Sequence, residues 1–235
     1  MAKTVVAEEK TVKKIILALS AMVLGACAGE PTLQTGPEAE TTFDGLVRVD
    51  NSRFSDAWAD PDADWARYDQ VLPGQAFFEF RAVKKTPQTT SGRINSSTDE
   101  FWIPEDSRVR LEEEVSAVFA EELANSERFT VTDAPGPNVL IIRGGLHDIV
   151  SRVPPELVGR GDIFLRSVGE ATIVIEAVDS MSGEVLARMV ERRSAERPGG
   201  QMQRSSPVTT WAEIRRLARR WASTLVDGMD SLPTE

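Results

Sequence analysis

The sequence is poor in the side chains that most often build metal sites and disulfides. It contains one cysteine, Cys27, and one histidine, His147, in 235 residues. A single cysteine excludes an internal disulfide and a zinc site built on several thiolates. The patterns GxSxG and HExxH and the phosphate-binding loop are also absent. We therefore expect no catalytic residue, no metal and no cofactor, and we expect the chain not to be an enzyme.

Long apolar runs are missing as well. The run near the N-terminus, Ile15 to Val23, is interrupted by Ser20. As a helix it would span roughly 14 Å at about 1.5 Å per residue, whereas the hydrocarbon core of a bilayer is about 30 Å thick. The run is too short for a transmembrane helix. Because lysines precede it and small residues follow it, it is typical of a secretory signal peptide, which we place at residues 1–26.

The position of Cys27 adds a second feature to this signal. A lone cysteine that closes an apolar run, after Leu24-Gly25-Ala26, resembles the lipobox of bacterial lipoproteins, in which the cysteine is acylated and becomes the mature N-terminus. The resemblance implies lipidation at Cys27, such as palmitate, and attachment to the membrane through this anchor. Ala28 stands where Asp would favour the inner membrane, so the resemblance implies the outer membrane, facing the periplasm. The alternative is an ordinary signal with a chance cysteine, or a buried core thiol.

Basic side chains are outnumbered by acidic ones, 27 against 37. The formal net charge is −10, and removal of residues 1–26 would take away four lysines and two glutamates and leave −12. Such a surface repels nucleic acid and anionic headgroups at long range. We therefore expect no nucleic-acid partner.

The remaining chain divides into a tether and one domain. Residues 27–42 contain Gly, Pro, Thr and Glu without apolar periodicity and are expected to be flexible. Residues 43–235 form the domain, which begins with an irregular arm over residues 43–74. The arm has four aromatic side chains that are expected to lie on the main body: Phe54, Trp58, Trp65 and Tyr68.

The pattern after the arm predicts five strands and two helices. Strands are expected at 75–83, 129–133, 139–150, 166–180 and 185–195, with a hairpin turn at Met181-Ser182-Gly183. Amphipathic helices are expected after Ser107, as a cap, and around an apolar stripe of Trp211, Ile214, Leu217, Trp221 and Leu225. This order indicates an α+β fold: a mostly antiparallel sheet of about five strands with two helices on one face. The strand before the first helix could pair in parallel with a later one, and Gly144-Gly145 indicates a bulge or a close backbone approach.

The candidate site is a cluster of arginines on the last helix. Helical spacing places Arg216 beside Arg220 and Arg215 beside Arg219, flanking the face opposite the tryptophans. Arginine suits bidentate contacts, so the cluster could dock an acidic partner or a lipid phosphate. The alternative is a solvated face whose arginines pair with Glu213 or with the acidic first helix.

His147 and a group of aspartates are weaker candidates. Catalysis at His147 would need Asp148 or Ser151 as a partner. Asp148 alternates to the other face of a strand, so a structural histidine is favoured. The stretch ADPDADW resembles the start of a calcium loop, but Trp65 stands where the loop needs glycine, so a solvated turn is favoured.

Several ordered segments together resemble a family of bacterial lipoproteins classed as a domain of unknown function. They include Tyr68, a Pro135-Gly136-Pro137 turn, an Asp179 to Glu184 hairpin and Trp211 on the last helix, and the likeness spans roughly residues 43–228. One departure is Glu191 before Arg192-Arg193, where the family tends to have Asp. The resemblance implies localisation and fold and supplies no catalytic residue.

Three hypotheses for function remain open. The first is a non-enzymatic accessory module of an envelope assembly, with an envelope protein as partner. The second is a binding protein for a small envelope ligand, such as a lipid or glycan fragment, in an apolar pocket under Trp58 and Trp65. The third, a hydrolase, needs a nucleophile beside a base or paired carboxylates, which the sequence does not indicate.

Overall fold

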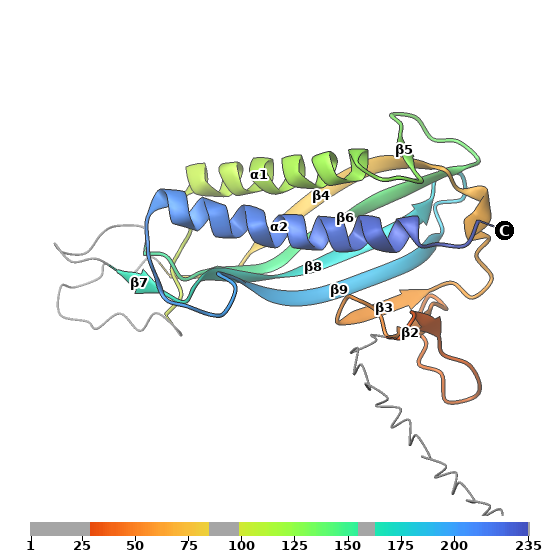
Figure 1. Cartoon of the computed structure of the whole chain (residues 1–235), viewed down its shortest axis with the longest axis horizontal. Coiled ribbons are helices and arrows are strands. Elements are labelled where there is room, and N and C mark those ends of the chain that lie inside the picture. The colour runs from red at the N-terminus through yellow and green to blue at the C-terminus, as the bar shows by residue number, and fades with distance from the viewer. Residues whose placement is uncertain (1–28, 85–98, 155–162, 235) are drawn as a thin grey trace, which may run out of the picture.

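The computed structural model describes residues 29–84, 99–154 and 163–234. Within them, two helices lie side by side on one face of a large sheet (Figure 1). The sheet has eight strands in the order β1-β2-β3-β9-β8-β6-β4-β5. The predicted signal peptide and Cys27 lie outside the described residues.

The described residues form strands of a large and a small sheet, two helices and one short 3-10 turn. The strands of the large sheet are β1 (Thr32–Leu33), β2 (Val47–Asp50), β3 (Asp56–Ala59), β4 (Gln70–Phe80), β5 (Thr130–Val131), β6 (Val139–Ser151), β8 (Ser167–Asp179) and β9 (Val185–Glu196). A separate two-stranded sheet joins β7 (Phe164–Leu165) to β10 (Gln203–Arg204). The helices are α1 (Glu105–Ala124) and α2 (Pro207–Asp230), and a 3-10 turn, η1, covers Trp65–Arg67.

The prediction of about five strands is wrong. The five expected strands correspond to β4, β5, β6, β8 and β9, but β1, β2 and β3 extend the sheet beyond β9. β1 comes from the segment expected to be a tether, and β2 and β3 come from the arm. These strands have two to four residues, too few for an alternating pattern to be recognised. β3 pairs along β9, where Asp56 to Ala59 lie opposite Val190 to Ala187, and β2 and β1 then add to β3 in turn.

The sheet is mixed. β4 pairs in parallel with β6, as the sequence allowed, while β6, β8 and β9 are antiparallel neighbours. A Cβ on Gly145 would lie 1.9 Å from the carbonyl oxygen of Phe77, and one on Gly144 would lie 2.0 Å from that of Val174. The close backbone approach predicted for this pair is therefore confirmed, and it lets both neighbouring strands lie against β6.

The core lies between the helices and the sheet. On β8 the alternate residues Ala171, Ile173, Ile175 and Ala177 are buried, as the period-two pattern predicts. They pack with Leu111, Val115 and Val118 of α1 and with Trp221 and Leu225 of α2. The prediction that Ser107 caps α1 is wrong, because the helix begins earlier and Pro104 occupies the cap position. Two acidic residues in the first turn, Glu105 and Asp106, interact favourably with the helix dipole instead.

The second helix begins with a capping box. The Ser206 hydroxyl accepts a hydrogen bond from the Thr209 N–H, and Pro207 follows the cap. Along the predicted stripe Trp221 and Leu225 are buried, but Trp211, Ile214 and Leu217 are only partly buried. Neither described helix is long and apolar enough to cross a membrane.

Candidate functional site

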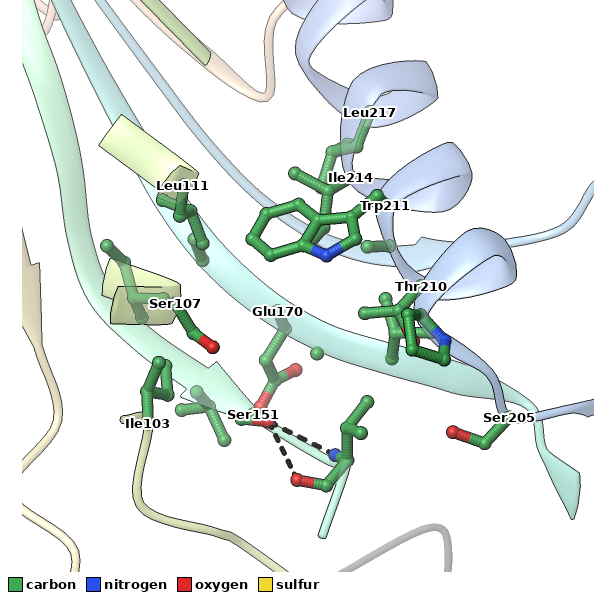
Figure 2. A pocket seen from close by; sticks show the side chains of 18 of the residues that line it. Ile103, Ser107, Leu111, Ser151, Glu170, Ser205, Thr210, Trp211, Ile214 and Leu217 are labelled. Carbon is green, nitrogen blue, oxygen red and sulfur yellow. Dashed lines mark hydrogen bonds between the residues drawn. The ribbon is translucent and has the colours of Figure 1, made fainter. Parts of the chain in front are cut away.

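A cavity of about 690 Å³ explains why the first half of the α2 stripe is incompletely buried. It lies between the N-terminal halves of the two helices and the adjacent ends of β6 and β8 (Figure 2). Leu111 of α1 and Trp211, Ile214 and Leu217 of α2 contribute to its wall. Further apolar lining residues are Ile103, Val115, Leu146, Ile149, Val150, Val153, Ile163, Val168, Ala171 and Trp221. The site is thus a largely hydrophobic chamber near one end of the fold.

The few polar side chains that line the cavity are hydroxyls, the carboxylate of Glu170 and the guanidinium of Arg204. The Ser151 hydroxyl already has a hydrogen-bond partner, because its Oγ accepts a hydrogen bond from the Val153 N–H at 3.1 Å. Glu170 binds Arg152 at 3.0 Å and Arg192 at 3.1 Å, so its charge is neutralised. The buried Oγ1 of Thr210 has no hydrogen-bond partner within the described part of the chain. Thr210 is therefore the group best placed to bind a polar atom of a ligand.

Charged residues outside the cavity hold its aromatic wall in place. The Arg110 guanidinium lies 4.2 Å from the centroid of the Trp211 ring. Glu114 binds both Arg110 and Arg215, the latter at 3.0 Å, which ties α1 to α2. These hydrogen bonds lower the pKa of Glu114, with the one from Arg215 contributing most. Arg110, Glu114 and Arg215 therefore hold the Trp211 side of the cavity in position from outside it.

The predicted arginine cluster lies on the outer side of α2, where Arg215, Arg216, Arg219 and Arg220 border an open groove of about 570 Å³. Arg215 binds Glu114, Arg216 binds the buried Glu213, and Arg219 binds Glu122 at 3.1 Å and Glu121 at 3.3 Å. Arg220 forms no ion pair with any residue that the structure describes. The pairing foreseen in the solvated-face alternative is present for three of the four arginines.

His147 lies away from this groove and from the cavity. Its Nδ1 is 2.8 Å from Glu79 Oε2, and its ring packs edge-on against Phe77. Asp148 has a φ of 52° at a bulge of β6 and binds Arg81 and Arg192. The hydrogen bond from Arg81 is the main reason that the pKa of Asp148 is lowered. His147 and Asp148 therefore interact with different partners and do not form one site. In residues 29–84, 99–154 and 163–234, no cluster of His, Cys, Asp or Glu could hold a metal ion.

The hairpin aspartate Asp179 is the centre of a buried polar cluster. It accepts hydrogen bonds from the Tyr68 hydroxyl at 2.7 Å and from the N–H groups of Met181 and Ser182 at 2.9 and 2.6 Å, and it also binds Arg67. Burial by itself would raise the pKa of Asp179, but these hydrogen bonds outweigh it and lower the pKa to about 2. Burial and the same carboxylate raise the pKa of Tyr68. The cluster fixes η1 against the β8–β9 turn.

A second buried carboxylate joins α2 to the sheet. Glu191 of β9 accepts a hydrogen bond of 2.6 Å from the indole N–H of Trp221 and also binds Arg193. The buried carboxylate of Glu191 therefore holds the helix on the sheet. Trp221 also lines the cavity, so this contact positions part of its wall.

The sequence did not predict the cavity. The ligand-binding hypothesis placed a pocket under Trp58 and Trp65, but Trp65 packs on the core and Trp58 lies beside Arg48. The one sequence signal was the stripe of Trp211, Ile214 and Leu217, and an apolar stripe looks the same whether it faces a packed core or a chamber.

Comparison with known proteins identifies a matching family model and several solved structures of distant similarity. A family model described as "Protein of unknown function (DUF3313)" matches residues 40–225. No curated protein matches the sequence. The PelC dodecamer of Paraburkholderia phytofirmans is 10% identical, with 67% of this chain and 89% of that chain covered and a TM-score of 0.32.

Two further structures are similar at the same level. A protein of Xanthomonas campestris is 11% identical, covers 83% of this chain and 90% of its own, and has a TM-score of 0.37. A protein of Chlamydia trachomatis is 10% identical, covers 68% and 98% respectively, and has a TM-score of 0.33. These likenesses assign no activity. Because the family match spans nearly the whole domain, the chain belongs to the DUF3313 family, whose function is unknown.

Proposed function

We propose that this protein is a lipid-anchored protein of the bacterial envelope that binds the acyl chain of an amphipathic lipid without catalysing a reaction. The observation that carries the proposal is the cavity of about 690 Å³ between the helices and the sheet. Protein interiors leave few voids larger than a water molecule, whereas ligand pockets typically measure about 300–1,000 Å³. The volume of the cavity is therefore typical of a ligand site and exceeds that of a packing defect.

The lining favours an acyl chain over a glycan fragment. A sugar presents hydroxyls on every side, and each one that is buried without a partner costs free energy. The walls offer mainly aliphatic and aromatic carbon, with a few hydroxyls, among them Ser107, Ser205 and Thr210. The two charged side chains are Arg204 and Glu170, and the charge of Glu170 is already neutralised. Such a surface fits a flexible hydrocarbon with one polar group.

The proposed location rests on the N-terminal sequence. Lipidation of Cys27 would attach the chain to a membrane, and Ala28 after it favours the outer membrane, facing the periplasm. A tethered domain of this kind would bind its ligand at the membrane surface, where lipids are concentrated.

Replacement of Ser107 by tryptophan tests the cavity. The side chain lies on the first turns of α1 and lines the chamber, so Ser107→Trp should fill it and weaken palmitate binding about tenfold or more. The measurement is equilibrium binding of radiolabelled palmitate to the full chain carrying Cys27→Ser. Ala117→Trp, at an exposed position of the same helix, is the matched control and should bind as the parent does. Equal binding by all three proteins, or no binding by the parent, would contradict the proposal.

The arginine groove favours a second candidate, docking of an acidic envelope protein. The specific observation is Arg220, which borders the groove and forms no ion pair with the described residues. Arg219→Glu with Arg220→Glu should reduce crosslinked partner in intact envelopes by about fivefold or more, because charge reversal repels an acidic surface. Arg216 is left unchanged, since it neutralises the buried Glu213. Arg53→Glu, another exposed position, is the control. Capture that is unaffected by the double change would rule out this candidate.

A further inference from the structure

A second cavity lies between α1 and the sheet. It measures about 340 Å³ and is bordered by α1, β4, β6 and β8. Gly74, Gly144 and Gly145 belong to its lining and contribute no side chain that would fill it. The buried side chains of the lining are all apolar: Val115, Leu123, Ile142, Leu146, Ile173 and Ile175. Like the first cavity, this one is therefore suited to hydrocarbon.

The two cavities follow one another along α1 and the sheet. On α1 the first cavity is lined by residues before Val115, and the second by residues after it. On β6 the second cavity is lined by residues before Leu146, and the first by residues after it. On β8 the change falls at Thr172. Three elements thus place the boundary between the cavities at the same level of the fold.

Val115 and Leu146 line both cavities, so their side chains lie between the two spaces. We call these two residues the partition. They are 6% and 5% exposed. A lipid with one acyl chain in each cavity would have to place its headgroup near the partition, where a polar group would be buried against apolar side chains at a cost in free energy. A single chain that ends at the partition avoids this cost.

The polar lining of the first cavity lies away from the partition. Ser205 and Thr210 stand on either side of the first residue of α2, Pro207. Both helices start at the same end of the fold (Figure 1), and Val115 lies near the middle of α1. A ligand whose polar group binds near Thr210 therefore directs its chain towards the partition.

We infer that Val115 and Leu146 set the length of the acyl chain that the protein binds, because the chain ends against them and the second cavity lies beyond. This inference rests on the function proposed above. Each methylene that enters apolar surroundings strengthens binding, so affinity rises with chain length until the partition blocks the chain. Truncation of both side chains would join the cavities and let a longer chain continue into the second one.

Relative binding of two fatty acids tests the inference. Equilibrium binding of radiolabelled palmitate and of docosanoate, which is six carbons longer, is measured with the full chain carrying Cys27→Ser. In this parent, docosanoate should bind no more tightly than palmitate. Val115→Ala with Leu146→Ala should raise the affinity for docosanoate relative to palmitate about tenfold or more. A smaller folded fraction lowers both affinities alike, so this ratio does not depend on stability.

The matched control is Val118→Ala with Leu140→Ala. These two residues are 4% and 0% exposed, lie on the same helix and strand as the partition, and belong to neither lining. The ratio of affinities should stay at the parent value. If the double partition variant does not fold, Val115→Ala and Leu146→Ala are tested singly, and each should shift the ratio about threefold or more.

The outcomes separate this inference from the proposed function. A ratio that shifts in the partition variants and not in the control supports the inference. An unchanged ratio, an equal shift in the control, or a parent that binds docosanoate more tightly than palmitate overturns it and leaves the cavity proposal standing. If the parent binds neither fatty acid, the proposed function fails, and the inference fails with it.

Discussion

Asp179→Ala should lower the free energy of unfolding by about 3–5 kcal/mol, the range seen when one partner of a buried charged cluster is removed. Asp179 is only 3% exposed and accepts hydrogen bonds from Tyr68, Met181 and Ser182. Without the carboxylate the Tyr68 hydroxyl and two backbone N–H groups lose their acceptor, and Arg67 loses its ion pair. Urea denaturation at pH 7 measures the change.

The dependence on pH provides a specific check of this prediction. Since the pKa of Asp179 is lowered from 3.8 to about 2, its ionisation stabilises the fold fully above the unfolded-state pKa, by about 2 kcal/mol. This contribution is lost as the pH falls from about 4 towards 2, so the difference between the parent and Asp179→Ala should shrink over that interval. Asp227→Ala, at an exposed ion pair, should change stability by about 0.5 kcal/mol or less at any pH. A constant difference between pH 7 and pH 2 would contradict the role assigned to the Asp179 charge.

Gly145→Ala should lower the free energy of unfolding by about 3 kcal/mol, at the upper end of the usual cost of overpacking. The new Cβ would lie 1.9 Å from the Phe77 carbonyl oxygen, and backbone cannot move away as a flexible side chain can. Relief of the contact requires β4 to separate from β6, which weakens the parallel pairing of these two strands. Thermal and urea unfolding both measure this effect.

Gly228→Ala is the matched control for this substitution. Gly228 lies in α2, and a Cβ there meets nothing within 4 Å. Alanine has a higher helix propensity, so this change should stabilise the protein by about 0.5–1 kcal/mol. If Gly145→Ala were as stable as Gly228→Ala, the close approach of β4 and β6 would not be needed for the fold.

The core elements could be predicted from the sequence because their patterns are local. Strict alternation from Ala171 to Ala177 determines which face of β8 is buried, and the spacing of Leu111, Val115 and Val118 determines the buried side of α1. The order of these elements then gives two helices on one face of a sheet. The Gly144-Gly145 pair also indicated correctly where two backbones come close.

The sequence by itself thus determined the α+β class, the strands β4, β5, β6, β8 and β9 and the two helices, since each is recognised from the residues of one segment. Only the tertiary structure decided that β1, β2 and β3 extend the sheet, because β3 pairs with the edge of β9 and β2 and β1 each pair with the strand before them in the sheet. It likewise decided that Trp211, Ile214 and Leu217 border a cavity. Whether an apolar stripe packs against other side chains or borders a cavity depends on the spacing between the two helices and the sheet. That spacing is a property of the assembled layers, and no single segment of the sequence encodes it.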